Sequence, residues 1–450
     1  MTKENLDKNT LGGRLKRYAK VTSTVSGLAA RLAGEKYLGV DFSRENHAKE
    51  LTAILGNLKG PILKVAQLLA TIPEALPREY VAELQQLQSD APSMGWLFVK
   101  RRMAAELGRS WQTKFNQFER TAAAAASLGQ VHKAKTLDDV SVACKLQYPD
   151  MGSAVEADLK QLKFIFSTFA KYDKAIATGH IYDELAERLY EELDYKLESR
   201  HCQLYGAMLK NESQIHVPQI IPELSTDRLL TSTWLQGDKI LNFVDSPLEQ
   251  RNQLAVNLFR AWYVPLYYYG VIHGDPHPGN YTIQADNSLN LLDFGCVRVF
   301  PPRFVEGVIR LYESLLTGDR DLSVAAYEAW GFENMSNELI DILNVWAKFL
   351  YGPILEDKTR TIGDVTNGVY GRETAEKVHT ELRRVGGVKV PREFVFMDRA
   401  ALGLGSVFLH LKAEVNWYQM FNELIADFDV QRLGDRQHKM ISAFGLTVPE

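Results

Sequence analysis

The sequence predicts an α+β fold with two lobes, in which strands fill one central region of the chain and helices fill both ends. Between residues 115 and 146 apolar and polar residues alternate as in strands, whereas before residue 110 and after residue 303 apolar residues recur with helical spacing. The length of 450 residues suits two or three structural units. Hydrophobic residues make up 46% of the chain, which is ample material for a sizeable core.

The expected domain boundaries follow these changes of pattern. Residues 1–110 are expected to form a helical extension. Residues 111–236 are expected to form a lobe with a five-stranded sheet, and residues 237–450 a mostly helical lobe. Leu235-Gln236-Gly237 is typical of a hinge between two lobes.

Composition excludes several classes of protein. A net charge of -4 gives no overall electrostatic attraction for nucleic acid. The three cysteines (Cys144, Cys202 and Cys296) have no paired spacing, which fits a reducing compartment and argues against a disulfide framework or a zinc site. Residues 1–9 lack the apolar core of a signal peptide, and no apolar run is long enough to cross a membrane. We expect a cytoplasmic protein, or one held peripherally on the inner face of a membrane.

Residues 11–38 predict a basic amphipathic helix. Apolar residues recur there with helical spacing, and the stretch contains six basic residues but a single acidic residue, Glu35. Such a helix can lie on an anionic membrane surface. It can also pack on the body of the protein with its basic face in water, and we favour this second interpretation slightly.

The stretch at residues 273–280, His-Gly-Asp-Pro-His-Pro-Gly-Asn, carries the strongest functional signal. Asp275 and Asn280 have the spacing of a kinase catalytic loop, in which the Asp handles the acceptor proton and the Asn holds Mg²⁺. Thirteen residues after Asn280, Asp293 begins the sequence Asp-Phe-Gly. Two short strands between them, at 281–283 and 289–292, predict a hairpin that brings the three side chains together. Their oxygens suit Mg²⁺ that bridges nucleotide phosphates.

A loop of small residues at 121–130 lies between strands expected at 115–120 and 131–134. A further strand at 140–146 presents Lys145 in Val-Ala-Cys-Lys, the arrangement in which a kinase covers and pairs the phosphates of ATP. Small residues let the backbone approach the phosphates, but alanine does not favour φ > 0, so this loop should be stiffer than a glycine-rich one. The expected nucleotide contacts besides the lysine are Ala124, Ala125, Ala126, Ser127, Gly129 and Gln130.

One long helix is expected at 181–209, and in a kinase such a helix supplies a Glu that pairs with the lysine. Asp194 and Glu198 are four residues apart and share a helix face, whereas Glu192 and Asp194 do not. Spacing alone does not identify which of these acidic residues pairs with the lysine. Strands expected at 217–224 and 229–234 complete the five-stranded sheet.

The rest of the chain predicts helices without recognisable chemistry. A helix at 250–269 leads into the catalytic loop, and further helices are expected from near Arg303, at 339–350 and at 399–428. No Ala-Pro-Glu follows Asp-Phe-Gly, and there is little room for a segment that docks peptides. An ordinary protein kinase is therefore disfavoured.

Taken together, these motifs resemble the UbiB/AarF family of atypical kinase-like proteins, which includes the mitochondrial ADCK proteins of coenzyme Q biosynthesis. The family's Lys-x-Gly-Gln motif appears as Lys64-Val-Ala-Gln67, and its alanine-rich loop and Glu-x-Asp motif appear at 124–132 and 192–194. The motifs at 273–280 and 293–295 complete the set in the family's order. The motif glycine is Ala66 here, and its extra methyl group would shift Lys64 if the helix crossing is tight.

The resemblance implies a bilobal protein-kinase-like fold whose N-terminal helical extension packs across the active site. By this analogy Lys64 contacts the Glu192/Asp194 motif, while Lys145 pairs with Glu198 and the nucleotide phosphates. The extension would occupy the space that a protein substrate normally takes. Some bacterial members end in membrane-spanning helices, and this chain shows no such segment, so membrane contact would be peripheral.

The expected function is that of an ATP- and Mg²⁺-dependent atypical kinase or ATPase that supports ubiquinone synthesis, with an unknown acceptor. By the resemblance, its partners are a nucleotide and also membrane lipids, quinone precursors or quinone-biosynthesis enzymes. Two alternatives remain open. One is a small-molecule kinase of the aminoglycoside or choline type, which shares the His-Gly-Asp loop. The other is a nucleotide-gated scaffold for membrane biosynthetic enzymes.

Overall fold

The computed structural model describes residues 94–449, except 126–127, 150, 157–158, 161–162, 164–185, 365–372, 375–376, 379, 383 and 386–390. Residues 1–93 of the predicted N-terminal extension, Lys64 and Gln67 among them, lie outside the described residues. The chain divides into two compact units. The first ends at Asp194 and also includes Thr226–Leu230, and the second contains Tyr195–Ser225 and Thr231–Glu450. The predicted three-part division stays a prediction.

The first unit is built on the predicted five-stranded sheet, with strand order β1-β3-β4-β6 and β2 paired to β3. Its strands are β1 (Phe115–Phe118), β2 (Ala124–Ala125), β3 (Gly129–Thr136), β4 (Ser141–Gln147) and β6 (Leu229–Thr233), which continues into the second unit. On β4 the side chains of Val142, Cys144 and Leu146 are fully buried. Lys145 lies between two of them and points to the other face, because strand side chains alternate.

An aromatic cluster joins helix α5 (Trp96–Leu107) to the sheet. The ring of Trp111 in η1 (Trp111–Lys114) lies 6.0 Å from Trp96 and 5.1 Å from Phe118. The buried Arg102 of α5 donates through Nε to the Gln147 carbonyl at 3.0 Å, at the end of β4. Helix α5 falls in the stretch predicted as the helical extension, residues 1–110, and both apolar and polar contacts hold it to the sheet.

The sheet reaches five strands in a different way from the one predicted. Residues 217–224 do not form a strand, because Pro218 and Pro222 have no N–H to donate to a ladder. A single bridge, between Ile220 and Ser232, remains there, and Pro222–Leu224 forms the short helix η2. The fifth strand is β2 instead, within the alanine-rich loop, where Ala124 pairs with Val131 and Ala125 with Gln130.

The single long helix predicted at 181–209 is also wrong within the described residues. Helical residues end at Glu191, a turn occupies 192–194, and α8 (Tyr195–Met208) starts afresh. The Leu193 carbonyl accepts from Nε2 of Gln147 at 3.0 Å, so the turn is held by a side chain of the sheet. Asp194 thus precedes the helix, and the periodicity that placed it on one face with Glu198 does not apply.

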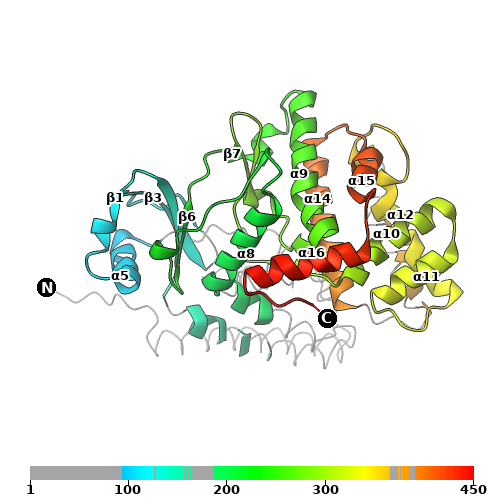
Figure 1. The fold of residues 1–450 in the computed structure, drawn as a ribbon, viewed down its shortest axis with the longest axis horizontal. Coiled ribbons are helices and arrows are strands. Elements are labelled where there is room, and N and C mark those ends of the chain that lie inside the picture. Colours follow the sequence, from blue (N-terminus) through cyan, green and yellow to red (C-terminus); the bar gives the residue numbers. More distant parts are fainter. Residues whose placement is uncertain are drawn as a thin grey trace, which may run out of the picture. The chain divides into compact units, whose positions relative to one another are not determined.

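The second unit packs helices around α9 (Leu248–Tyr269), much of whose length is buried (Figure 1). The other long helices are α10 (Pro302–Thr317), α11 (Arg320–Ala329), α12 (Asn337–Tyr351), α14 (Arg392–Leu411), α15 (Trp417–Ile425) and α16 (Val430–Ala443). The buried Gln437 of α16 donates to the carbonyls of Tyr269 and Phe300 at 2.9 and 2.8 Å. This fixes the end of α9, where Gly270 adopts φ +65, which glycine tolerates best.

Two small sheets lie at the end of α9. The strands β5 (Ile215–His216), β10 (Leu289–Leu291), β9 (Tyr281–Ile283) and β7 (Asp238–Lys239) pair in that order. The strands β8 (Val271–His273) and β11 (Val297–Val299) form an antiparallel pair. The hairpin predicted between the catalytic loop and Asp-Phe-Gly is confirmed as β9 and β10, with Leu291 opposite Tyr281.

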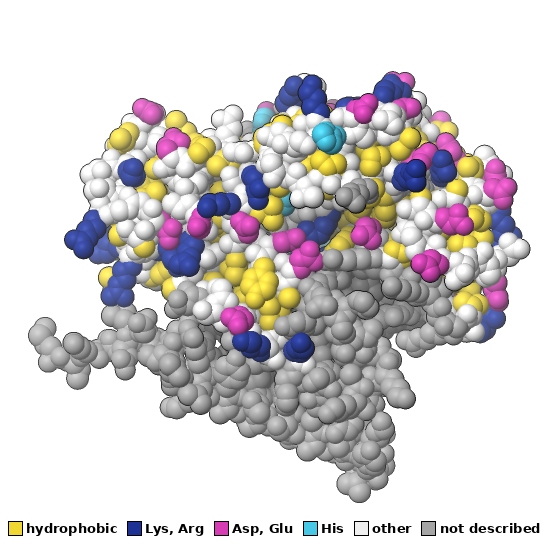
Figure 2. Space-filling view, turned by 60° about the horizontal axis from the view of Figure 1, so that its bottom comes forward, with side chains coloured by type: hydrophobic (Ala, Val, Ile, Leu, Met, Phe, Trp, Pro, Cys, Tyr) yellow, Lys and Arg dark blue, Asp and Glu magenta, His cyan; other side chains and the backbone are white. Residues whose placement is uncertain are grey.

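The helix predicted at 399–428 is two helices, α14 and α15. Lys412 ends α14 in the left-handed region at φ 47, and the side chain of Asn416 accepts from the Gln419 N–H at 3.0 Å to begin α15. Figure 2 shows basic and acidic side chains interspersed over the visible face of the described residues. No helix in the described part of the chain is long and apolar enough to cross a membrane.

Candidate active site

The predicted metal-binding residues lie at the exits of short strands in the second unit. Asp275 follows β8, Asn280 ends the short helix η4 (Pro278–Asn280), and Asp293 follows β10. The Nδ2 of Asn280 donates to the Asp275 carbonyl at 3.0 Å. The Leu292 N–H donates to the Asn280 carbonyl at 3.1 Å. These bonds link the catalytic loop to the residue immediately before Asp293.

His273 connects the two halves of this site. Its Nδ1 accepts from the Asp275 N–H at 3.2 Å, and its Nε2 contacts the Asp293 carbonyl. A carbonyl can only accept and an amide N–H can only donate, so the ring is neutral with its proton on Nε2. The ring is 3% exposed. One buried imidazole therefore holds the backbones of Asp275 and Asp293 at a fixed separation.

Aromatic side chains surround His273. The rings of Trp262, Phe294 and Tyr205 lie 5.7, 5.9 and 6.0 Å from it. The Trp262 Nε1–H also donates to the Tyr281 hydroxyl at 3.0 Å, and burial raises the pKa of Tyr281 well above its ordinary value. These rings enclose the imidazole and keep water away from it.

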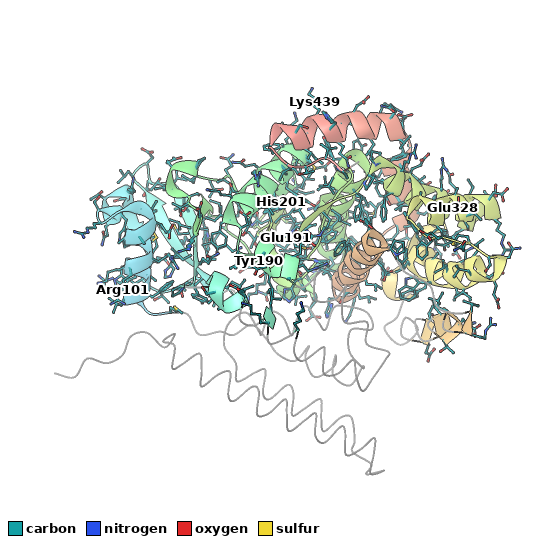
Figure 3. All side chains as sticks on the ribbon, turned by 90° about the horizontal axis from the view of Figure 1, so that it is seen from below. Arg101, Tyr190, Glu191, His201, Glu328 and Lys439 are labelled. Carbon is teal, nitrogen blue, oxygen red and sulfur yellow. The ribbon has the colours of Figure 1, made fainter. Side chains whose placement is uncertain are left out.

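His201 of α8 adds a second buried histidine in the interior of the same unit (Figure 3). Its Nδ1 lies 3.2 Å from the Phe294 carbonyl and must donate to it. Burial lowers the pKa of His201 to about 4. The peptide units on both sides of Phe294 are therefore each held by a buried histidine, the first by His273 and the second by His201.

The side chains present fit a magnesium ion. The Nδ2 of Asn280 is occupied by the Asp275 carbonyl, so its Oδ1, the atom that Mg²⁺ prefers, is directed away from that bond. The Oδ1 of Asp293 accepts from the Gly295 N–H at 2.9 Å, which fixes the orientation of the carboxylate. Asn280 is needed as a ligand in this arrangement, because no group of three His, Cys, Asp or Glu side chains in the described residues could hold a metal ion.

The first unit carries the predicted phosphate-facing residues. Ala124 and Ala125 of β2 are exposed, and Lys145 is half-buried on β4. Gly129 begins β3 opposite Gln147. Ala126 and Ser127 lie outside the described residues. The nucleotide contacts of this group stay a prediction.

Gln130 has a different environment from the one predicted. Its side chain is fully buried, and its Oε1 accepts from the Met94 N–H at 2.7 Å. Its Nε2 donates to the Met94 carbonyl at 3.1 Å and to Nε2 of His132 at 2.8 Å. The Nδ1 of His132 in turn donates to the Glu119 carbonyl at 2.9 Å. These contacts fasten both ends of the alanine-rich loop to the lobe and give no support to a nucleotide contact by the Gln130 amide.

The acidic residues fall in two local settings. Glu192 and Asp194 lie in the turn before α8, and Glu198 is buried on α8 with 4% exposure. Pairing of Lys145 with Glu198, and of Lys64 with the Glu192/Asp194 motif, stays a prediction.

Sequence reasoning missed His273, His201 and the Gln130–Met94 contact. The two histidines carry no spacing signal, because the backbone carbonyls that they contact, Asp293 and Phe294, are 20 and 93 residues away in the chain. Only the position of His273, two residues before Asp275, could have drawn attention to it. The role of Gln130 was hidden because its partner, Met94, is a backbone group outside every motif.

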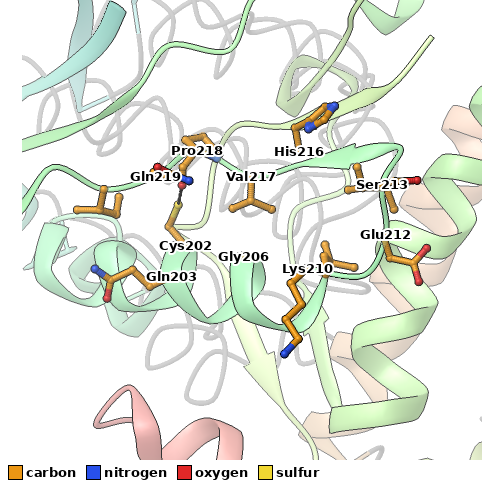
Figure 4. Close-up of a pocket in the computed structure, with 13 residues that line it drawn as sticks. Cys202, Gln203, Gly206, Lys210, Glu212, Ser213, His216, Val217, Pro218 and Gln219 are labelled. Atoms are coloured by element: carbon orange, nitrogen blue, oxygen red, sulfur yellow. Dashed lines mark hydrogen bonds between the residues drawn. The ribbon is translucent and has the colours of Figure 1, made fainter. Parts of the chain in front are cut away.

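A separate cavity of about 570 Å³ lies between α8 and the following segment, and Figure 4 shows its lining residues. Glu212 at its edge is paired with Arg260 at 2.6 Å, and the Cys202 thiol donates to the Pro218 carbonyl at 3.2 Å. None of the predicted site residues line it.

Comparison with known proteins gives a family match and several relatives. A family model described as the ABC1 atypical kinase-like domain matches residues 86–327, more than half of the chain. The mitochondrial atypical kinase COQ8 of Saccharomyces cerevisiae is 27% identical over 397 residues, which cover 85% of this chain and 77% of the relative. The chloroplastic protein ACTIVITY OF BC1 COMPLEX KINASE 7 of Arabidopsis thaliana is 34% identical over 52% of this chain.

Coverage of the relatives is uneven. The chain spans only 42% of the mitochondrial atypical kinase coq-8 of Caenorhabditis elegans and 35% of the Arabidopsis protein. Among solved structures, Rv3197 of Mycobacterium tuberculosis, determined in complex with erythromycin, matches with a TM-score of 0.60 and 27% identity. That match covers 85% of this chain and 96% of the other. These likenesses confirm the predicted kinase-like fold.

Proposed function

The chain belongs to the ABC1 atypical kinase-like family of UbiB and ADCK proteins, and on that premise we propose that it binds ATP with Mg²⁺ and transfers or hydrolyses the γ-phosphate. Asn280 and Asp293 hold the magnesium ion in this proposal, and Asp275 positions the nucleophile. Lys145 pairs with the phosphates. Bound magnesium would neutralise the charge that develops on the transferred phosphate.

One observation carries the proposal. Asp275, Asn280 and Asp293 are linked, within a single compact unit, by the two contacts of a buried imidazole and by two further hydrogen bonds. A network of hydrogen bonds of this kind holds the side-chain oxygens in place before the metal ion and the nucleotide bind. Such preorganisation is the main source of catalysis in phosphoryl transfer.

We propose that the activity supports ubiquinone or related prenyl-lipid synthesis, as membership of the UbiB and ADCK family implies. The relatives COQ8 and coq-8 are named as mitochondrial atypical kinases, and the Arabidopsis relative as a chloroplastic protein. Under this proposal the acceptor is a quinone precursor or a partner enzyme at a membrane surface. The basic helix expected at 11–38, outside the described residues, is the candidate for peripheral membrane contact.

Phosphate release from ATP by the purified chain tests this function. The assay compares the wild type with Asp275→Asn, with and without Mg²⁺, and with vesicles that do or do not contain a prenylated phenol. Losing one electrostatic contact of this kind costs about 3–4 kcal/mol of barrier, so we expect a drop of roughly two to three orders of magnitude. Release that does not depend on Mg²⁺ or on Asp275 would contradict the proposal. Quinone and precursor levels after gene deletion test the pathway separately.

A small-molecule acceptor is the second candidate, because the solved neighbour with a TM-score of 0.60 was determined with erythromycin bound. Transfer of labelled phosphate to a panel of amino alcohols, aminoglycosides and macrolides distinguishes the two. Product formation with one of these compounds, but not with vesicles, favours the small-molecule kinase.

A further inference from the structure

Helix α14 contacts the catalytic loop and the strand β11 that follows Asp-Phe-Gly. A Cβ atom built on Gly403 would lie 2.2 Å from Cγ of Pro276, the residue directly after Asp275. The same built atom would lie 3.3 and 3.4 Å from Cβ and Cδ of that proline. The helix backbone therefore rests directly against the catalytic loop, and only a residue without a side chain fits.

A second contact lies two turns away on the same helix. The guanidinium of Arg298 in β11 stacks 5.0 Å from the ring centre of Phe396. Phe396 and Gly403 are seven residues apart, which places them on one face of α14. This face thus touches the loop that follows β8 and the strand that follows Asp-Phe-Gly.

The rest of α14 is firmly held in the second unit. Asp398 accepts from Nε1–H of Trp346 in α12 at 2.7 Å. Nη1 of Arg251 in α9 donates to the carbonyls of Leu411 and Lys412 at 2.9 and 2.7 Å. The side chains of Ala400, Leu404, Val407 and Leu411 are at most 1% exposed. A helix anchored at several points to α9 and α12 can act as a rigid support for the loop that rests on it.

We propose that Gly403 is a positioning residue, through which α14 fixes the catalytic loop and so the placement of Asp275 relative to Asp293. The chain uses glycine there because the loop's proline occupies the space of the first side-chain carbon. A methyl group at 403 pushes Pro276, and with it the adjacent Asp275, away from the helix. The effect on catalysis rests on the proposed nucleotide function, whereas the placement of the loop does not.

Gly405 supplies a matched control on the same helix. A Cβ built there meets no atom within 4 Å, so Gly405→Ala makes the same chemical change without the contact. The gain in helix propensity is the same for both variants. Any difference between Gly403→Ala and Gly405→Ala therefore reports the contact with Pro276.

The test measures hydrogen exchange of the 271–283 peptide and Mg²⁺-dependent turnover in wild type, Gly403→Ala and Gly405→Ala. We expect faster exchange only in Gly403→Ala, with kcat about 10- to 100-fold lower and KM nearly unchanged, because small misplacements of reacting groups have effects of that size. Equal exchange in the two variants would overturn the inference. Absence of Mg²⁺-dependent turnover in the wild type would refute the proposed function but leave the exchange comparison decisive.

Pro276→Ala completes the design, since it removes the Cγ and Cδ atoms that the new methyl meets. In this background Gly403→Ala should no longer accelerate exchange, which is the coupling that a direct contact requires. If Gly403→Ala does not fold, recovery of folding in the double variant supports the contact. Continued failure of the double variant, while Pro276→Ala folds, overturns it.

Discussion

The alanine-rich loop of the first unit and the proposed metal-binding loop of the second unit, residues 273–280, are supported in different ways. The alanine-rich loop exposes the side chains of Ala124 and Ala125, whose backbone pairs with β3, and buried side chains, Gln130 and His132, fasten its ends. The metal-binding loop is supported along its length, by a buried imidazole below and by α14 beside it.

This difference indicates that the two loops have different structural requirements. A phosphate-covering loop needs a close backbone approach and some freedom, so fixing its ends is enough. Metal ligands must keep their separation to within a fraction of an ångström, so their support lies next to them. Substitutions at the supports should therefore affect function in the second unit, and mainly stability in the first.

The largest effect is expected from His273→Phe. The substitution leaves the Asp293 carbonyl and the Asp275 N–H without their partner in a buried place, which costs about 2–4 kcal/mol of unfolding free energy. It also frees the two loops from each other, so Mg²⁺-dependent nucleotide affinity should fall at least tenfold. Urea unfolding and calorimetric titration measure the two quantities.

His277→Phe is the control for this variant, because His277 is exposed in the same loop and its Nδ1 accepts from the exposed Gly279 N–H at 3.0 Å. Its loss of stability should stay below about 1 kcal/mol. If both substitutions changed stability and nucleotide affinity equally, His273 would not be the residue that holds the two loops together.

Acid should weaken the second unit through His201. Its pKa is lowered from 6.5 to about 4 in the folded chain, so between these values the unfolded chain binds more protons. The stability is fully present above pH 6.5 and is lost as pH falls towards 4, by up to about 3 kcal/mol.

His201→Asn retains a donor for the Phe294 carbonyl but does not titrate, so its unfolding free energy should fall less steeply across this window. Urea unfolding at several pH values from 7 to 4.5 compares the slopes. The assignment of the acid effect to His201 fails if the slopes of the variant and the wild type coincide.

A smaller effect is expected from Gln130→Leu in the first unit. The amide's bonds to the Met94 backbone and to His132 are lost, but Met94 is partly exposed and water can replace some of them. We expect a loss of about 1–2 kcal/mol in stability, with Mg²⁺ affinity unchanged. Gln117→Leu, at an exposed position of β1, is the matched control. A large loss of nucleotide binding by Gln130→Leu, without loss of stability, would instead support a contact between Gln130 and the nucleotide.

Much of the second unit's site was predictable from sequence because its elements are local. The strands at 281–283 and 289–291 surround a short turn, so alternation alone located the hairpin and the two residues beside it. The strands of the first unit were harder to predict from the sequence. Ala124–Ala125 gave no strand signal, since two alanines carry no alternation, and the pairing with β3 decides their conformation.

Other features depend on contacts that no local pattern encodes. The helix break at 192–194 is held by the Gln147 side chain, 46 residues earlier in the chain. The contact of Gly403 with Pro276 joins residues more than a hundred positions apart, and a glycine inside a helical pattern indicates nothing by itself about its partner.

Calorimetric titration of Asp293→Asn with ATP in Mg²⁺ tests the central claim most directly. Asp435→Asn, the same change at an exposed position of α16, serves as the control. The account predicts that Asp293→Asn folds with wild-type stability to within about 1 kcal/mol. It also predicts that this variant loses Mg²⁺-dependent nucleotide binding, while the control binds as the wild type does. Nucleotide binding by Asp293→Asn with wild-type affinity and Mg²⁺ dependence would contradict the account.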